Sequence, residues 1–289
     1  MKRLLWLIAV ILLAPGLTTQ GQAQEQTPAE KLGWQLGVHA YTFRKFSIFD
    51  AIDKTAGLGL KYMSLSGSIS LDGKTSMPTM NLSDQDLAAI HKKLDAAGIK
   101  LLNIGVVQLS PDEAKSRKVF EFAKKLGVDT LVSEPEPAAL DTVEKLCKEY
   151  NIKVAIHDHP KPSHYWNPDT VLEAVKGRTP LMGACADTGH WQRSGLDPVE
   201  CVKKLEGRII CFHFKDLTER SPKGHDVPWG TGQGDVKGVL AEMKRQNFHG
   251  AFLVEYEWNW DNSVPEIAEC VKNFNAMCAD LVATPSPAK

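Results

Sequence analysis

The stretch from Leu181 to Asp216 decides the fold of this chain. It opens with LMGACADTGHW (181–191) and closes with RIICFHFKD (208–216). Both pieces are short apolar runs that end in groups able to bind a metal or carry a proton. These groups are Asp187 and His190 in the first run, and His213, Lys215 and Asp216 in the second. Such runs are typical of buried parallel strands, which deliver functional groups at their C-terminal ends.

The same pattern of an apolar run, a loop and a capped amphipathic helix repeats from Gly33 onward. Helix starts are indicated by capping side chains at Ser47, Ser83, Ser110, Asn167 and Asp197. The predicted strands are Gln35–Tyr41, Lys61–Leu65, Lys100–Val106, Thr130–Ser133, Lys153–His157, Met182–Asp187, Arg208–Phe214 and Ala251–Glu255. Eight β–α alternations over about 250 residues predict a single parallel (β/α)8 barrel, a TIM barrel, over residues 33–282.

A doubly wound open sheet is the rival fold. Its phosphate-binding turn after the first strand is rich in glycine, whereas the turn here reads Tyr41-Thr42-Phe43-Arg44. The sequence therefore favours the barrel.

The N-terminal segment is interpreted as a cleavable signal peptide, residues 1–23. A basic start (Lys2, Arg3) precedes the apolar run Leu4–Leu13, and Gly21-Gln22-Ala23 fits a cleavage site. An uncleaved anchor is the alternative, although the apolar run is short for a membrane span. We expect a periplasmic or secreted protein with no membrane contact after cleavage, a polar linker at 24–32 and a flexible tail at 283–289.

The charge balance argues against a nucleic-acid partner. The net charge is −1, and loss of Lys2 and Arg3 with the signal peptide makes it −3. A mildly acidic chain lacks the basic surface that binds phosphate backbones. The six cysteines show no CxxC spacing and lie in predicted strands and helices, so we interpret them as small core residues.

Acidic and imidazole side chains gather at the ends of several predicted strands. Besides the groups named above, these are His39, Tyr41, Glu134, Glu136, His157, His159, Glu255 and Glu257. We interpret Glu136 as a helix-start charge and Glu257 as a loop residue. Burying the others together requires compensation, and one divalent cation would provide it. Ligation by Asp, Glu and His without thiolate suits Mn²⁺, Mg²⁺, Co²⁺ or Zn²⁺.

The alternation of side chains along a strand adds a constraint. Cys185 shares a face with Asp187, and Cys211 shares a face with His213. If the cysteines line the barrel interior, Asp187 and His213 also point inward.

These motifs resemble the xylose-isomerase-like barrel superfamily, the sugar phosphate isomerase/epimerase group. The resemblance covers nearly all of 33–281, and its most specific pieces are DTGH (187–190), HFKD (213–216), VPWGTG (227–232) and the strand-end Glu255. It implies that Asp187, His213 and Glu255 bind one divalent cation, with Mn²⁺ as the first choice. It also implies that His190 contacts a substrate oxygen.

The chain departs from the family at the fifth strand. Similar epimerases have a glutamate there, where this chain has His157. Either His157 replaces that glutamate as the fourth ligand, or Glu134 reaches in from the neighbouring strand. Because the family's two glutamates move a proton between the faces of the sugar carbon, we assign Glu134, His157 and Glu255 as the catalytic candidates.

The resemblance implies proton abstraction next to a carbonyl of a keto-sugar, through an enediolate. We expect a metal-dependent sugar isomerase or epimerase with a small carbohydrate substrate. The runner-up is a lyase that cleaves a 3-keto-glycoside by β-elimination, and a non-catalytic sugar-binding barrel is the alternative from another class. The assigned substrate-binding residues are Tyr41, His159, His190, Lys215 and Trp229, and a homo-oligomer is left open.

Overall fold

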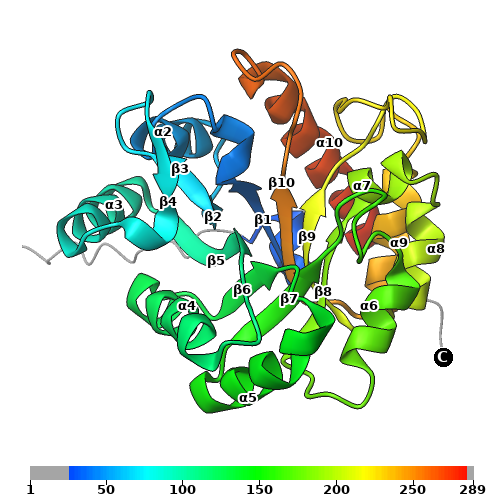
Figure 1. Ribbon diagram of the computed structural model, residues 1–289. Helices are drawn as coiled ribbons and strands as arrows, with labels where there is room; N and C mark the ends of the chain where they lie inside the picture. Colours follow the sequence, from blue (N-terminus) through cyan, green and yellow to red (C-terminus); the bar gives the residue numbers. More distant parts are fainter. Residues whose placement is uncertain (1–25, 285–289) are drawn as a thin grey trace, which may run out of the picture.

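The computed structural model describes residues 26–284, and the predicted signal peptide lies outside that part of the chain. Eight parallel strands close into a barrel surrounded by helices (Figure 1). In chain order, which is also their order around the barrel, the strands are β1 (Trp34–His39), β2 (Tyr62–Ser66), β5 (Lys100–Val107), β6 (Thr130–Ser133), β7 (Lys153–His157), β8 (Met182–Asp187), β9 (Ile209–Phe214) and β10 (Gly250–Val254). The (β/α)8 prediction is confirmed, and a closed barrel excludes the open sheet.

The helices of the outer ring are α2 (Ile48–Gly57), α3 (Asp84–Ala97), α4 (Glu113–Leu126), α5 (Leu140–Tyr150), α6 (Pro168–Val175), α7 (Thr188–Arg193), α8 (Pro198–Lys204), α9 (Val236–Arg245) and α10 (Val264–Ala283). Ser47 and Ser83 form the predicted capping boxes with Asp50 and Asp86. Asn167 and Asp197 also cap their helices as expected. None of the helices in residues 26–284 is both long and apolar enough to cross a bilayer.

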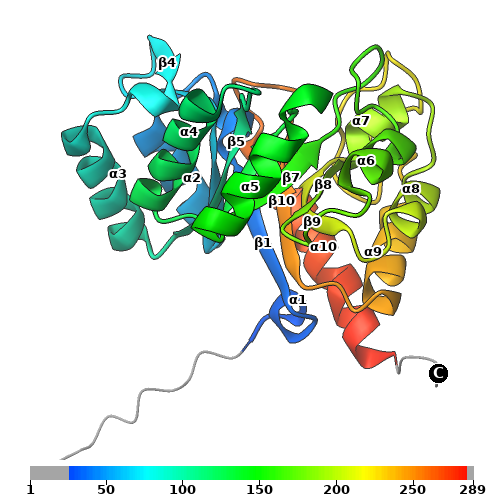
Figure 2. The same ribbon diagram turned by 60° about the horizontal axis from the view of Figure 1, so that its bottom comes forward.

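Two segments differ from the prediction. Residues 28–31, expected in the polar linker, form the one-turn helix α1 (Pro28–Lys31), because Thr27 and Glu30 make a reciprocal capping box. Figure 2 shows α1 beneath the barrel, where it packs against α10. Strand β1 ends at His39, and the predicted strand residues Ala40 and Tyr41 belong instead to the 3₁₀ helix η1 (Ala40–Phe43).

A small hairpin after β2 was not predicted at all. Strands β3 (Ser68–Ser70) and β4 (Ser76–Pro78) pair antiparallel beside the barrel and lead through η2 (Thr79–Asn81) into α3. A second short 3₁₀ turn, η3 (Pro137–Ala139), precedes α5. The hairpin stands at the same end of the barrel as the turn after β1, and this position matters below.

The molecule has two separate cores. The larger one fills the layer between the strands and the helices. The smaller one fills the barrel interior, and its buried residues are Val132, Ala155, Cys185, Cys211, Ala251 and Leu253. Cys185 and Cys211 thus lie in the barrel interior, which meets the condition under which Asp187 and His213 also point inward. All six cysteines are buried and free, in agreement with their interpretation as core residues.

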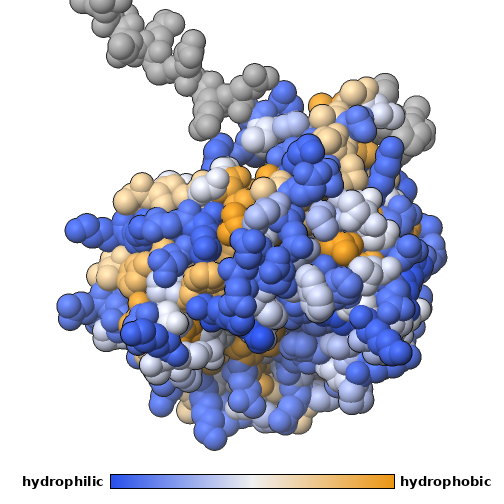
Figure 3. All heavy atoms as spheres, turned by 90° about the horizontal axis from the view of Figure 1, so that it is seen from above, coloured by the Kyte–Doolittle hydropathy of each residue, from blue (hydrophilic) through white to orange (hydrophobic). Residues whose placement is uncertain are grey.

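The surface is mixed in character. The face seen in Figure 3 is mostly hydrophilic, and its apolar residues form small separated patches. Among the described residues, Trp258 and Val282 are the large hydrophobic side chains with the greatest exposure, at 48% and 43%. Trp258 lies in the loop after β10, beside the opening of the barrel, and its ring packs on His225.

One predicted cap is wrong, and it provides a test of helix α4. Its N-cap is Asp112, whose carboxylate accepts from the N–H groups of Ala114 and Lys115. The hydroxyl of Ser110, the predicted cap, has no hydrogen-bond partner.

We expect Asp112→Ala to lower the free energy of unfolding by about 1 kcal/mol. The control Ser110→Ala should change it by less than about 0.5 kcal/mol. Urea unfolding measures both, and equal effects would contradict the assignment of the cap.

Candidate active site

The site residues follow directly from the inner core. Along β6, β7, β8, β9 and β10, the residue two positions after an inward side chain also points inward. The rule predicts inward side chains two positions after each residue of the inner core: Glu134 after Val132, His157 after Ala155, Asp187 after Cys185, His213 after Cys211 and Glu255 after Leu253. Five neighbouring strands therefore place a carboxylate or imidazole at the same end of the barrel, as predicted.

A buried ion cluster forms the centre of the site. The ammonium of Lys215 contacts Asp187 and Glu255, and the Lys215 side chain is fully buried. Burial alone would lower the pKa of Lys215, but the two carboxylates outweigh it and raise that pKa well above its ordinary value. In the same way, burial acts to raise the pKa of Glu255, but the ammonium holds it well below the usual range. Lys215, predicted to bind substrate, therefore neutralises two predicted metal ligands.

The DTGH and HFKD motifs interlock around this lysine. The hydroxyl of Thr188 donates to the carbonyl of Lys215 (2.7 Å) and accepts from its backbone N–H (2.8 Å). The stem of Lys215 passes so close to Gly189 that a β-carbon there would lie 2.5 Å from Cδ. The threonine and glycine of the first motif thus fix the lysine of the second.

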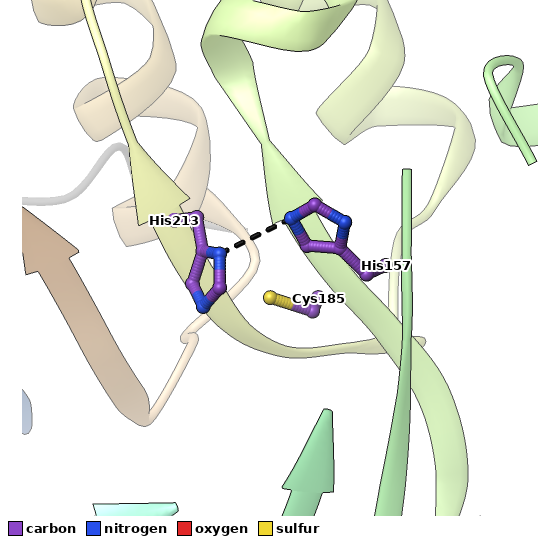
Figure 4. Close-up of side chains that lie close together, drawn as sticks. All are labelled: His157, Cys185 and His213. Carbon is purple, nitrogen blue, oxygen red and sulfur yellow. Dashed lines mark hydrogen bonds between the residues drawn. The ribbon is translucent and has the colours of Figure 1, made fainter. Parts of the chain in front are cut away.

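His157 lies between two groups of acidic residues. Its Nε2 faces Asp187 Oδ2 (3.5 Å) and His213 Nδ1 (3.1 Å), and Figure 4 shows the two rings with Cys185 beside them. Its Nδ1 faces Glu134 Oε1 at 3.2 Å. Burial would lower the pKa of His157, but Asp187 and Glu134 raise it to about 10. The geometry places His157, rather than Glu134, toward the centre of the site.

Glu134 acts from behind that ring. Its Oε1 also contacts Nδ1 of His159, and its Oε2 accepts from the Ser163 hydroxyl at 2.9 Å. Burial acts to raise the pKa of Glu134, but the two histidines lower it below its ordinary value. Carboxylates commonly orient metal-binding histidines in this way. Glu134 groups with His157 and His159 as a candidate ligand set, apart from Asp187 and Glu255.

Glu255 is held by two more imidazoles. Nδ1 of His213 lies 3.3 Å from its Oε2, and Nδ1 of His39 lies 3.0 Å from its Oε1. The other nitrogen of His39 is 3.0 Å from the carbonyl of Gly105, which fixes the ring. Burial lowers the pKa of His213 to about 3, and the neighbouring His39 acts in the same direction. His213 is therefore neutral and able to ligate a metal.

Arg193 was not predicted, yet it connects helix α7 to the loops after β9 and β10 at the site. It donates to Glu257 (2.5 Å) and Asp226 (3.0 Å), and its NH1 lies 3.1 Å from His190 Nδ1. Because a guanidinium only donates, that nitrogen accepts, which assigns the ring proton to Nε2. Burial lowers the pKa of His190 well below its ordinary value, and the Lys215 ammonium acts in the same direction. His190 is a neutral hydrogen-bond donor toward the cavity.

Three acidic residues were missed or misinterpreted. Glu257 is a partner of Arg193, not only a loop residue. Asp226 is buried, and burial raises its pKa to about 7. Asp158 accepts from the backbone N–H of Asp187 at 2.8 Å and so supports β8 from behind. In the sequence, only its position beside His157 could have indicated a structural role for Asp158. No local pattern indicates the roles of Glu257 and Asp226.

Asp216 serves the fold rather than proton transfer. Its buried carboxylate accepts from the backbone N–H groups of Gly230, Gly232 and Gly234, at 2.8–2.9 Å. A β-carbon at Gly232 would lie 2.4 Å from that carboxylate, so the loop requires glycine there. Trp229 in the same loop is fully buried against Phe214 and Phe274. The prediction that Trp229 contacts substrate is therefore wrong, because its ring packs in the layer outside the barrel.

A cavity of about 310 Å³ opens above the cluster and is called the site cavity below. Its lining residues are His39, Tyr41, Ser66, Gly67, Ser68, Val106, His157, His159, His190, Glu255 and Glu257. Of the predicted substrate-binding residues, Tyr41, His159 and His190 line it. Ser64 on β2 is buried and bonded to Asn103.

The donor set fits a divalent cation. One ligand atom from each of His157, Asp187 and Glu255 lies within 4.8 Å of the other two, and His190 beside them carries its proton on Nε2 and so is not counted as a ligand. His213 Nδ1 joins them through contacts of 3.1 Å to His157 and 3.3 Å to Glu255. Two ligands bound tetrahedrally at 2.0–2.1 Å would be about 3.3 Å apart, so these spacings suit coordination.

The raised pKa of His157 predicts a pH effect on metal-free protein. The folded value is about 10, and the unfolded value is about 6.5. The stabilisation is therefore complete below about pH 6.5 and is lost as the pH rises through about 10. In EDTA, His157→Gln should reduce the fall in unfolding free energy between pH 7 and 10, by up to about 1.4 kcal/mol per pH unit.

Urea unfolding at pH 6, 8 and 10 measures this effect. The matched control is His164→Gln, because His164 is exposed in the loop after β7. The control should keep the wild-type pH dependence. A His157→Gln variant with the wild-type dependence would show that the imidazole is not held charged by Asp187 and Glu134.

Comparisons with known proteins agree with this architecture. An inosose dehydratase of Clostridium tetani (strain Massachusetts / E88) is 30% identical over 135 residues, which cover 41% of this chain and 45% of that enzyme. The chain spans less than half the length of the curated relatives that it matches. A crystal structure from Parabacteroides distasonis ATCC 8503 is 35% identical, with a TM-score of 0.67 and coverage of 84% of this chain and 98% of that one.

A xylose isomerase-like TIM barrel protein from Mycobacterium smegmatis, solved in complex with magnesium, has a TM-score of 0.68. It covers 86% of this chain and 97% of its own, and at 13% identity it supports the fold alone. The model of the family described as xylose isomerase-like TIM barrel matches residues 52–274, which is most of the barrel. With its closed barrel and its motifs at the strand ends, the chain belongs to the xylose isomerase-like TIM barrel family.

Proposed function

We propose that this protein is a divalent-metal-dependent enzyme that removes a proton next to the carbonyl of a keto-sugar, as an isomerase or epimerase. The observation that carries the proposal is the convergence of His157, Asp187 and Glu255, with His213 Nδ1 3.1 Å from His157 and 3.3 Å from Glu255, at a cavity that His157 and Glu255 line. A binding protein without chemistry does not need a buried cluster of this charge density, which burial makes expensive.

The proposed ligands are Asp187, His213, Glu255 and His157, with Glu134 orienting His157. Mn²⁺ is our first choice among Mn²⁺, Mg²⁺, Co²⁺ and Zn²⁺, since all four accept mixed oxygen and nitrogen ligands. When bound, such a cation polarises a carbonyl and acidifies the adjacent C–H bond.

The chain's own groups would perform the proton transfer. Glu255 is held ionised at the cavity wall, so it is the candidate base. His190 lines the cavity and carries its proton on Nε2, 3.6 Å from Asp187 Oδ2, so it is the candidate donor to the substrate oxygen that gains charge. His157, with Nδ1 toward Glu134 and Nε2 toward the proposed ligands, would have no free nitrogen for proton transfer, so it would act as a ligand and not as a second base.

A lyase is the second candidate, and the residue at β7 favours it. An epimerase works symmetrically with two similar bases, whereas this site pairs Glu255 with an imidazole. His159 lines the cavity, is about half exposed and contacts Glu134, so it is placed to protonate a leaving group. β-Elimination from a 3-keto-glycoside would use that asymmetry, and the named activity of the Clostridium tetani relative is also a dehydration.

Export is part of the proposal. The basic start and apolar run of residues 1–23 support a signal peptide. A protein outside the cytoplasm would meet free keto-sugars or keto-glycosides more readily than sugar phosphates. The net charge of −3 after cleavage accords with a small neutral substrate rather than a nucleic acid.

Metal binding is the first test. Purified protein should bind about one divalent cation per chain, measured by elemental analysis and calorimetry, and Asp187→Ala should abolish it. The control is Glu219→Gln, an exposed carboxylate in the loop after β9, which should bind as wild type does. A wild-type protein without metal affinity, or Asp187→Ala with unchanged affinity, would refute the proposal.

The reaction is tested separately with metal-loaded enzyme. An isomerase or epimerase should exchange a C–H proton of a ketose for deuterium in D₂O, as seen by NMR. Under the lyase alternative, a 3-keto-glycoside should release its aglycone. Glu255→Gln should lower either rate by at least about 100-fold, since general bases contribute 10²–10⁴-fold.

A further inference from the structure

The site cavity does not end at the catalytic residues. A second cavity of about 370 Å³ adjoins it and shares Tyr41, Ser66 and Ser68 with its lining. We call this second space the side lobe. The two cavities together have more than twice the volume of the site cavity, and each alone lies near the lower end of the usual range for ligand pockets.

The side lobe lies between the turn after β1 and the unpredicted hairpin. One wall is η1 with the start of α2, which contributes Phe43, Phe46 and Ala51. The other wall is the β3–β4 hairpin, which contributes Ile69, Ser70 and Ser76. The lining therefore combines aromatic and aliphatic side chains with serine hydroxyl groups. Sugar rings combine an apolar C–H face with hydroxyls at the edge, so this lining suits a sugar unit.

The positive charges around the side lobe already have partners. Arg44 stacks on Trp260 at 4.0 Å and donates to the Tyr41 hydroxyl at 2.5 Å. Lys45 is paired with Asp261 at 2.8 Å. Among the described residues that line the lobe, Arg44 and Lys45 are the cations. Of the two cations, Lys45 is neutralised by an acid, whereas the contacts of Arg44 are to neutral groups, so the neutral charge of the ligand rests on the proposed export and not on the lobe's own charge.

We infer that the substrate is a neutral glycoside with two units, such as a disaccharide. The reacting keto-sugar ring would occupy the site cavity, and the second ring would occupy the side lobe, with Tyr41 at the junction of the two. This inference rests on the proposed function, because it assumes that the site cavity takes the sugar ring. It adds the size and charge of the substrate, and it gives the β3–β4 hairpin a role in binding.

The test compares a ketose with its glycosides. Isothermal titration calorimetry on the Mn²⁺-loaded full chain would use fructose, lactulose and isomaltulose, which are respectively a ketose and two neutral disaccharides that contain it. We expect at least one disaccharide to bind about tenfold more tightly than fructose, which corresponds to about 1.4 kcal/mol.

Ser76→Trp fills the side lobe from the exposed hairpin without touching the site cavity, because Ser76 lines only the lobe. This variant should bind fructose as wild type does and should lose the tenfold preference. The matched control is Thr75→Trp, since Thr75 is exposed, adjacent and outside both linings. The control should keep the preference.

The outcomes separate this inference from the proposed function. If wild type binds fructose as tightly as both disaccharides, or if Ser76→Trp keeps the preference, the side lobe is not a sugar subsite and the inference falls alone. If the loaded protein binds none of the three sugars, both the inference and the proposed keto-sugar activity fall. A preference lost in Ser76→Trp and kept in Thr75→Trp supports both.

Discussion

The two-residue repeat of a β-strand is the constraint on which the site depends. An inward side chain in the barrel interior commits the residue two positions later to the same direction. Small residues at Ala155, Cys185 and Cys211 let the strands approach around a thin inner core. The charged residues that follow them on each strand then come together above this apolar inner core. A register shift of one residue in any strand would turn its functional group into the helical layer.

The two sequence motifs are structural devices as much as chemical ones. Thr188 and Gly189 hold and accommodate Lys215, so half of DTGH serves its neighbouring strand. Asp216 gathers three backbone N–H groups of the following loop, so the last residue of HFKD organises the chain after it. Only Asp187 and His213 of these motifs are left as predicted ligands. Residues of one motif thus have different roles: Asp187 and His213 are predicted ligands, whereas Thr188, Gly189 and Asp216 position other parts of the chain.

Strand ends were predictable because they depend on short-range patterns. The bounds of β6, β7 and β8 match the prediction, since apolar runs there stop abruptly at polar residues. The β3–β4 hairpin was not predictable, because its three-residue strands are too short to show a period. The link from Arg193 to Glu257 joins residues 64 positions apart and leaves no local signal. Trp229 shows a further limit, because an indole looks the same in sequence whether it faces a substrate or a packed layer.

The buried ammonium of Lys215 has a consequence for how the protein matures. The carboxylates of a metal site repel one another when no ion is bound. Many small metal-binding domains do not fold without their ion. Here the chain supplies its own positive charge to Asp187 and Glu255. Folding of this site therefore does not require an ion to neutralise the two carboxylates. Under the proposed metal binding, Lys215 would be a placeholder, and a cation would enter by exchange for an internal charge rather than by filling a void.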